Sequence, residues 1–121
     1  MPIASATIAK TFEQQAHKYG TRAFLKEKHG GVWHDHAWQD LADRAKRLRG
    51  GLAQLGIQPG DRVAILAENG PNWVVFDQAV LGLGGVVVPL YTTSGADEMR
   101  HVIADSGARL VGVQGATLVE K

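Results

Sequence analysis

The chain has 121 residues, which is enough for one modest domain with a buried core. Apolar residues make up 45% and charged residues 21%, a balance that excludes a disordered chain. The net charge of +1 gives no electrostatic basis for a nucleic-acid partner, and the absence of cysteine excludes disulfides and thiolate metal sites. No signal peptide is visible, and no apolar run approaches the roughly 18 residues of a membrane span, so a cytoplasmic location is expected.

The first half of the chain predicts a helix, a hairpin and a longer helix. Apolar residues recur at helical spacing as Ile8, Phe12, Ala16 and Tyr19, and Gly20 follows as a stop. Two β-type runs, 23–29 and 32–38, flank Gly30-Gly31, a pair suited to a tight turn. The clearest helix ends at Gly56, and its apolar stripe comprises Leu41, Ala45, Leu48, Leu52 and Leu55.

From residue 62 onward, three short apolar runs alternate with two helical segments. The runs 62–67, 86–91 and 109–113 are expected to be strands buried on both faces. The first helix begins at Asn69-Gly70-Pro71 and the second is expected to be capped by Ser94. Their predicted core residues are Trp73, Phe76, Val80 and Leu83 in the first, and Met99 and Ile103 in the second. The order β-α-β-α-β calls for a parallel sheet with right-handed crossovers, so the fold class is α/β.

Three glycines, Gly82, Gly84 and Gly85, resemble a phosphate-binding loop by composition. Such a loop follows a strand and opens a helix, whose N-terminus carries free N–H groups. Here the glycines follow a helix and precede a strand, so they meet carbonyl groups and the negative end of the helix dipole. The sequence therefore predicts a joint in the fold.

The segment from Trp38 to Val113 resembles the N-terminal part of the adenylate-forming acyl-CoA synthetases, the AMP-binding superfamily. The stretch AWQDLADRAKRLRGGLAQLGIQPGDRVAILAENGPNW is similar to the first motif of that family, and VLGLGGVVVPLYTTSGADEMRHVIADSGARL to the second. Ala37 departs from the Ser or Thr usual at the helix start, which removes an N-cap worth about 1 kcal/mol. The Tyr-Thr-Thr-Ser ending is closest to the long-chain fatty-acid branch. The residues that match the second motif are Gly85, Pro89, Leu90 and Glu98.

The resemblance implies that residues 1–121 form the N-terminal portion of an AMP-binding domain, with 1–56 holding the helix, hairpin and long helix and 57–121 beginning an αβ sheet. The parent would join a fatty carboxylate to AMP from ATP with Mg²⁺, then pass the acyl group to CoA. The family's ATP loop and catalytic lysine would lie beyond Lys121. No catalytic, cofactor-binding or metal-binding residue is therefore expected here, and the fragment is expected to be inactive and without a cofactor.

Two other functional classes remain open. A small flavodoxin-like module could hold a nucleotide at its strand carboxyl ends, although proline and tryptophan crowd the turn at Asn69-Gly70. A non-catalytic interaction fragment could pair with a remainder chain. Because the remaining strands and covering helices of the parent would be missing, the chain is expected to self-associate through open sheet edges and an uncovered apolar face.

Four groups of side chains could carry chemistry, and each has a simpler explanation. A hairpin turn at Gly30-Gly31 would put Glu27, His29, His34 and His36 on one face, a plausible metal set by residue type, but a solvated surface is favoured. The basic run on the long helix could contact a membrane, yet nearby aspartates favour an ordinary solvated face. The tryptophans are expected to pack, and the serines lack the setting of a nucleophile. These residues are Arg44, Lys46, Arg47 and Arg49; Trp33, Trp38 and Trp73; and Ser5, Ser94 and Ser106.

Overall fold

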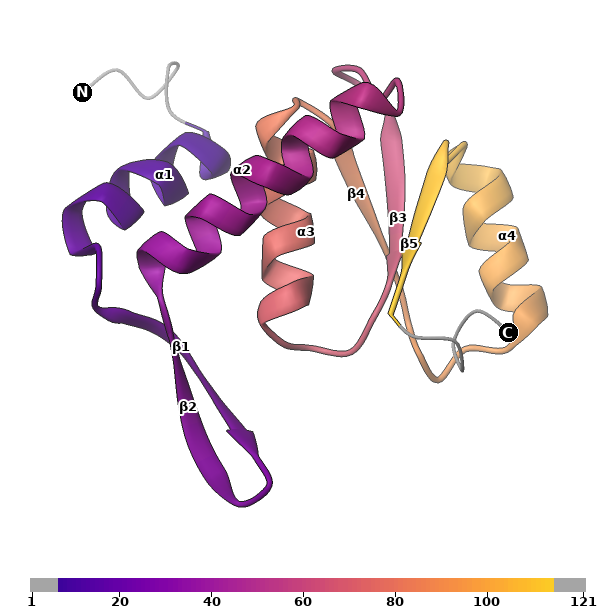
Figure 1. Ribbon diagram of the computed structural model, residues 1–121. Helices are drawn as coiled ribbons and strands as arrows, with labels where there is room; N and C mark the ends of the chain where they lie inside the picture. The colour runs from indigo at the N-terminus through magenta and orange to yellow at the C-terminus, as the bar shows by residue number, and fades with distance from the viewer. Residues whose placement is uncertain (1–6, 115–121) are drawn as a thin grey trace.

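The computed structural model describes residues 7–114 (Figure 1). A helix, a hairpin and a long helix precede three strands that alternate with two helices, as predicted. The elements in chain order are α1 (Ile8–Tyr19), β1 (Ala23–His29), β2 (Val32–Ala37), α2 (Trp38–Gln54), β3 (Arg62–Leu66), α3 (Pro71–Gly82), β4 (Val86–Leu90), α4 (Ala96–Ser106) and β5 (Leu110–Val113).

The three later strands form one sheet in the order β4-β3-β5, and both pairs are parallel. In the centre, Val63 lies between Val87 of β4 and Leu110 of β5. Within β3, the residues from Val63 to Leu66 are almost fully buried, because helices cover both faces of the sheet. The predicted α/β class is therefore confirmed.

Figure 1 shows α2 and α3 on one side of this sheet and α4 on the other. On the first side, Val63 packs with Ala79 and Val80 of α3 and with Leu52 of α2. On the second side, Ala64 and Leu66 pack with Met99 of α4. Successive residues of β3 thus face opposite layers, as the pleat of a strand requires.

The N-terminal helix and the hairpin base share a third core cluster with the sheet half. Phe12 of α1, Leu41 and Ala45 of α2 and Val75 of α3 are its buried members. Trp38 lies beside Phe12, Phe24 and Tyr19, with ring centroids 3.9 to 5.9 Å apart. Figure 1 shows the rest of the hairpin projecting from this cluster, away from the helices.

The amino ends of the strands are joined by side chains as well as by the sheet. The Asp61 carboxylate accepts hydrogen bonds from the Gln58 N–H at 2.7 Å and from Arg109 Nη1 at 3.2 Å. Arg62 donates through Nε to the Ser106 carbonyl at the C-terminal end of α4. Charged donors at a helix C-terminus satisfy carbonyls that lack a partner within the helix.

Several expectations about single residues are wrong. Ile8 and Leu55 are each 69% exposed, because Ala9 takes the inward position in α1 and α2 ends before Leu55. Trp38 begins α2 instead of ending the second hairpin strand. The edge strands β4 and β5 are only partly buried, with Val86 47% and Val113 37% exposed. Each error lies at the end or edge of an element.

The helix starts also differ from expectation in one case. Gly95 is the N-cap of α4 and no side chain caps it, so the expected cap at Ser94 is wrong. Ala37 precedes α2 in an extended conformation and makes no capping bond, as its side chain predicts. The third expected helix start, Gly115-Ala116, lies outside the described residues.

Gly112 of β5 gives the first prediction, because a Cβ at this position would lie 2.5 Å from Cε2 of Phe76. We expect Gly112→Ala to lower the free energy of unfolding by about 1–3 kcal/mol, the usual cost of overpacking a core. Urea denaturation followed by circular dichroism would measure it. The matched control is Gly51→Ala on the exposed part of α2, where nothing lies within 4 Å and helix propensity favours alanine. Equal stability of the two variants would contradict this packing.

Asp77 of α3 gives the second prediction. Burial raises the pKa of its carboxyl above its ordinary value of 3.8, so the folded state holds this proton more tightly than the unfolded chain does. The charged form thus costs stability, and this cost grows as the pH rises through the folded pKa. We expect Asp77→Asn to raise the Tm at pH 7 and to lose that gain as the pH falls below 3.8. Asp43→Asn, at an exposed position of α2, is the matched control for the removal of one negative charge.

Candidate functional site

The glycines at the end of α3 form a joint, as predicted. Gly84 has φ +76°, a conformation that side chains disfavour, and its carbonyl accepts from the Gly60 N–H at 2.9 Å. A Cβ on Gly85 would lie 2.9 Å from Cγ1 of Val80 and 3.2 Å from the Asp61 carbonyl. The missing side chain of Gly85 thus lets α3, β4 and the turn before β3 pack against one another. This packing leaves no room for a phosphate.

The carboxyl edge of the sheet holds the crevice where α/β proteins usually bind ligands. The chain adds β4 on one side of β3 and then returns to add β5 on the other side. The carboxyl ends of β3 and β5 therefore form the topological switch point of the sheet. The crevice there measures about 300 Å³ and carries no charged side chain. It suits an apolar group better than a phosphate. Its lining residues are Ile65, Ala67, Asn72, Phe76, Gly112, Val113 and Gln114.

The N-terminus of α3 lies beside this crevice and is already surrounded by charge. Gly70 is its N-cap without a side-chain bond, and Pro71 removes one N–H donor. Oε2 of Glu27 lies 3.5 Å from the position that a Gly70 Cβ would take. Arg44 of α2 donates to Oδ1 of Asn72 in the first turn. The cation at this helix start therefore comes from α2, and its guanidinium is bonded to a side-chain amide.

The hairpin has the predicted register, with Glu27 opposite His34 and His29 opposite Val32. His36 Nε2 lies 3.3 Å from Oε1 of Glu27, and the rings of His29 and His34 have centroids 6.3 Å apart. The face therefore separates into two pairs. Within residues 7–114, no group of three or more such side chains converges as a metal site would require. That the chain binds no metal here stays a prediction.

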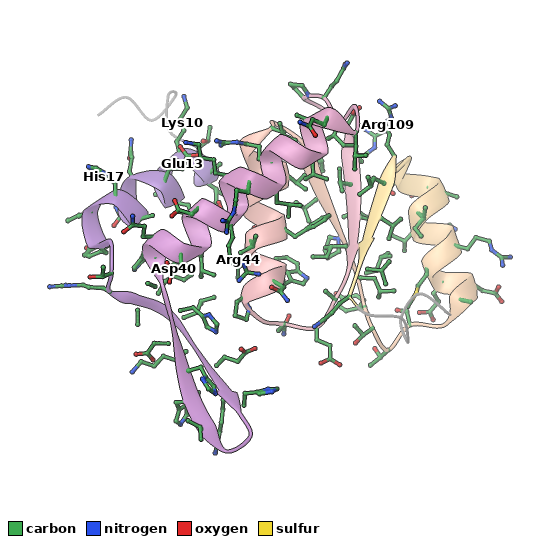
Figure 2. The ribbon with its side chains drawn as sticks, in the orientation of Figure 1. Lys10, Glu13, His17, Asp40, Arg44 and Arg109 are labelled. Carbon is green, nitrogen blue, oxygen red and sulfur yellow. The ribbon has the colours of Figure 1, made fainter. Side chains whose placement is uncertain are left out.

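Two residues of the basic run on α2 bond to neighbouring helices, whereas a solvated face was expected. Arg49 donates to Oε1 of Glu13 on α1 at 2.8 Å, and its side chain covers Gly82 of α3, where a Cβ would meet Cδ at 3.0 Å. Figure 2 shows Glu13 on α1 close to α2, and Arg44 on the side of α2 that faces α3. Lys46 and Arg47 are exposed, as expected. Two of the four cations thus tie three helices together.

The tryptophans and serines follow expectation only in part. Trp38 is a packing residue and Trp73 is half-buried, but Trp33 is 63% exposed at the hairpin tip, with Lys28 Nζ 5.9 Å from its ring centroid. Packing was the wrong expectation for Trp33, because the tip of the hairpin projects away from the core. The Ser106 hydroxyl donates to the Ile103 carbonyl at 3.2 Å. Ser5 lies outside the described residues.

A second, larger groove lies between α4 and the end of β4. Its volume is about 530 Å³ and its lining is mostly apolar. Pro89, Leu90 and Glu98, three residues of the second motif, all line it, whereas Gly85 belongs to the joint. The resemblance to the family groups these residues in one motif, and the structure brings three of them to one surface. Within the part of the chain that the structure describes, no helix combines the length and apolarity needed to cross a bilayer.

Comparison with known proteins shows which family shares this sequence and fold. Residues 12–121 match the family model described as AMP-binding enzyme. Long-chain-fatty-acid–CoA ligase FadD15 of Mycobacterium bovis is 41% identical over 78 residues, which are 64% of this chain and 13% of the relative. Long-chain-fatty-acid–CoA ligase ACSBG1 of Bos taurus is 28% identical over 123 residues, covering 99% of this chain and 17% of the relative.

A solved structure shows the same fold. The inhibitor-bound N-terminal domain of FACL13 from Mycobacterium tuberculosis aligns with a TM-score of 0.84 and 27% identity, over 93% of this chain and 28% of that one. The chain therefore spans under a third of the relatives and of the structure that it matches. With the family model matched from Phe12 to its last residue, this chain belongs to the AMP-binding enzyme family.

Proposed function

We propose that this chain is the N-terminal portion of the AMP-binding domain of an ATP-dependent fatty-acid–CoA ligase, and that it is inactive by itself. The family match over residues 12–121 supports this proposal, together with relatives that are named long-chain-fatty-acid–CoA ligases. In the parent, the fatty carboxylate would attack the α-phosphate of ATP and release pyrophosphate. The thiol of CoA would then displace AMP and leave the acyl thioester.

The described residues supply packing to such an enzyme, and we assign no catalytic, cofactor-binding or metal-binding role to them. Donors that neutralise phosphate charge are needed for adenylate formation, since charge develops there in the transition state. At the start of α3, Glu27 opposes an anion and Arg44 is bonded to Asn72. The start of α4 carries Asp97 and Glu98 in its first turn. Both helix starts thus disfavour a triphosphate.

Mg²⁺ would accompany ATP in the parent and neutralise phosphate charge. The described residues do not fit that ion, because no cluster of carboxylate or imidazole ligands forms within residues 7–114. We therefore assign Mg²⁺, like ATP and CoA, to the remainder of the parent. A cytoplasmic location and peripheral contact with a membrane surface, to which Lys46 and Arg47 would contribute, belong to the same proposal.

The stand-alone flavodoxin-like module is the competing function. The switch-point crevice favours it by position, since ligands of such modules bind there. The uncharged lining and the carboxylate near Gly70 count against a nucleotide in that crevice. Binding of ATP by the isolated chain therefore separates the two functions.

The third prediction is that the chain alone neither binds ATP·Mg²⁺ tightly nor forms an adenylate. Calorimetric titration should show no binding tighter than about millimolar, near −4 kcal/mol. With a long-chain fatty acid and CoA added, the chain should release no pyrophosphate, whereas a longer product of the same reading frame should release it in a fatty-acid-dependent way. A micromolar dissociation constant for the short chain would support the stand-alone module instead.

The fourth prediction is that the hairpin face holds no structural metal. Ligands that bind only the folded state raise its stability by mass action, so zinc at a real site would raise the Tm. We expect equimolar zinc and a chelator to leave the Tm unchanged. His34→Ala should behave as the wild type does in both conditions. A rise of several degrees that His34→Ala abolishes would show that the Glu27–His36 pair and the His29–His34 pair converge on an ion.

A further inference from the structure

A small cavity lies where α1, α2 and α3 meet. Its volume is about 10 Å³, which is roughly the room that one water molecule requires. Phe12 and Ala45 line it with buried apolar surface. The cavity shares no lining residue with the crevice at the switch point. Polar side chains from all three helices also line it, namely Glu13 of α1, Lys46 and Arg49 of α2, and Gln78 of α3.

The side-chain amide of Gln78 is only half satisfied. Its Nε2 donates to Oδ2 of the neighbouring Asp77 at 3.4 Å, which is long for a hydrogen bond. Its Oε1 is buried, and among the buried side-chain nitrogen and oxygen atoms of residues 7–114 it is the one without a hydrogen-bond partner in the protein. A buried oxygen that accepts no hydrogen bond lowers stability by its whole desolvation cost. Native interiors avoid that cost, so this oxygen marks a place where a further donor binds.

The charges and the size of the cavity decide which donor fits. The cations Lys46 and Arg49 outnumber the single carboxylate of Glu13, so a metal cation is disfavoured. A volume of about 10 Å³ excludes any ligand of several heavy atoms. Water is neutral, fits this volume, and both donates and accepts hydrogen bonds. It can therefore serve the amide of Gln78 in either orientation and still bond to a second group.

The wider groove between α1 and α2 gives water a path to this cavity. The groove measures about 590 Å³. Gln78 and the buried Phe12 line the cavity but not the groove, which places the cavity on the side of the core. A water molecule can therefore exchange with solvent without opening the apolar cluster. The lining residues that groove and cavity have in common are Glu13, Ala42, Lys46 and Arg49.

We propose that one long-lived water molecule occupies this cavity and donates a hydrogen bond to Oε1 of Gln78. Its remaining bonds go to Glu13 and Arg49, which are themselves joined at 2.8 Å. Buried water molecules typically make about three hydrogen bonds, and this arrangement supplies that number. The water thus links α3 to the ion pair between α1 and α2. The inference goes beyond the proposed function and does not rest on it, because the water and its partners lie within α1, α2 and α3.

Magnetic resonance tests the water directly. We expect the methyl protons of Ala45 to show an Overhauser contact with water whose sign is that of a bound molecule. The exposed methyl group of Ala53 on the same helix is the control, and it should show only brief hydration. In Gln78→Met, which has no amide oxygen, the contact at Ala45 should disappear. A wild-type chain without this contact, or a Gln78→Met variant that keeps it, overturns the inference.

Thermal unfolding of Gln78→Met gives a second test. This exchange keeps the length of the side chain and removes both polar atoms. Were Oε1 truly without a donor, the variant would lose its desolvation cost and the Tm would rise by about 3 °C or more. With water bound, the variant loses the bridge between the helices, so we expect an unchanged or lower Tm. The matched control is Gln14→Met, at an exposed position of α1.

The outcomes of the two tests are independent of the ligase parent. A rise in the Tm of Gln78→Met that Gln14→Met does not share overturns the bound water. If Gln78→Met fails to fold, the wild-type contact between water and Ala45 decides by its presence or absence. None of these results bears on the ATP titration, which tests the proposed function separately.

Discussion

The close contact between Gly85, Val80 and the Asp61 carbonyl is the constraint on which the rest of the structure depends. It holds the end of α3, the start of β4 and the turn before β3 at distances that no side chain at Gly85 would allow. From this point β4 runs alongside β3 in register, and Val80 reaches full burial. A larger residue at Gly85 would move α3 off the sheet and open the cluster that includes Leu52 and Val63.

This contact also explains why a glycine-rich stretch need not bind phosphate. Composition alone cannot distinguish a loop that admits a ligand from one that admits another piece of backbone, since both need the missing Cβ. The order of the flanking elements does distinguish them, and that order is visible in the sequence. The structure then adds the partner, because the space beside Gly85 is filled by Val80 and Asp61.

Much of the fold could be predicted from local patterns, because helix stripes and apolar strands leave a periodic signal. The errors fall where a pattern ends. Leu55 continues the α2 stripe in sequence, but the helix stops before it. Ser94 suits a helix start, yet the chain turns one residue later, at Gly95. Moving either boundary by one residue leaves the periodic signal unchanged, so the sequence alone does not show where α2 ends or where α4 begins.

The candidate site was less predictable, since its contacts join residues far apart in the chain. Arg44 bonds Asn72, Arg49 bonds Glu13, and Glu27 lies against Gly70. In the sequence, Arg44 and Arg49 belong to the basic run of the long helix and Glu27 to the histidine face of the hairpin, and neither pattern indicates these partners. Their partners follow from the packing of α1, α2 and the hairpin against α3, and spacing within one helix carries no record of that packing. Trp33 shows the converse case, in which an aromatic residue suggests a core and the hairpin carries it into solvent.

The shared cluster of Phe12, Leu41, Ala45 and Val75 has a consequence for synthesis of the chain on the ribosome. Residues 1–56 emerge first, yet their core lacks a buried wall until α3 has left the exit tunnel. The N-terminal half therefore waits with its apolar stripe exposed while about twenty further residues are added, at roughly 5–20 residues per second. For that interval of seconds, the apolar stripe of α2 is exposed to solvent and open to binding by chaperones.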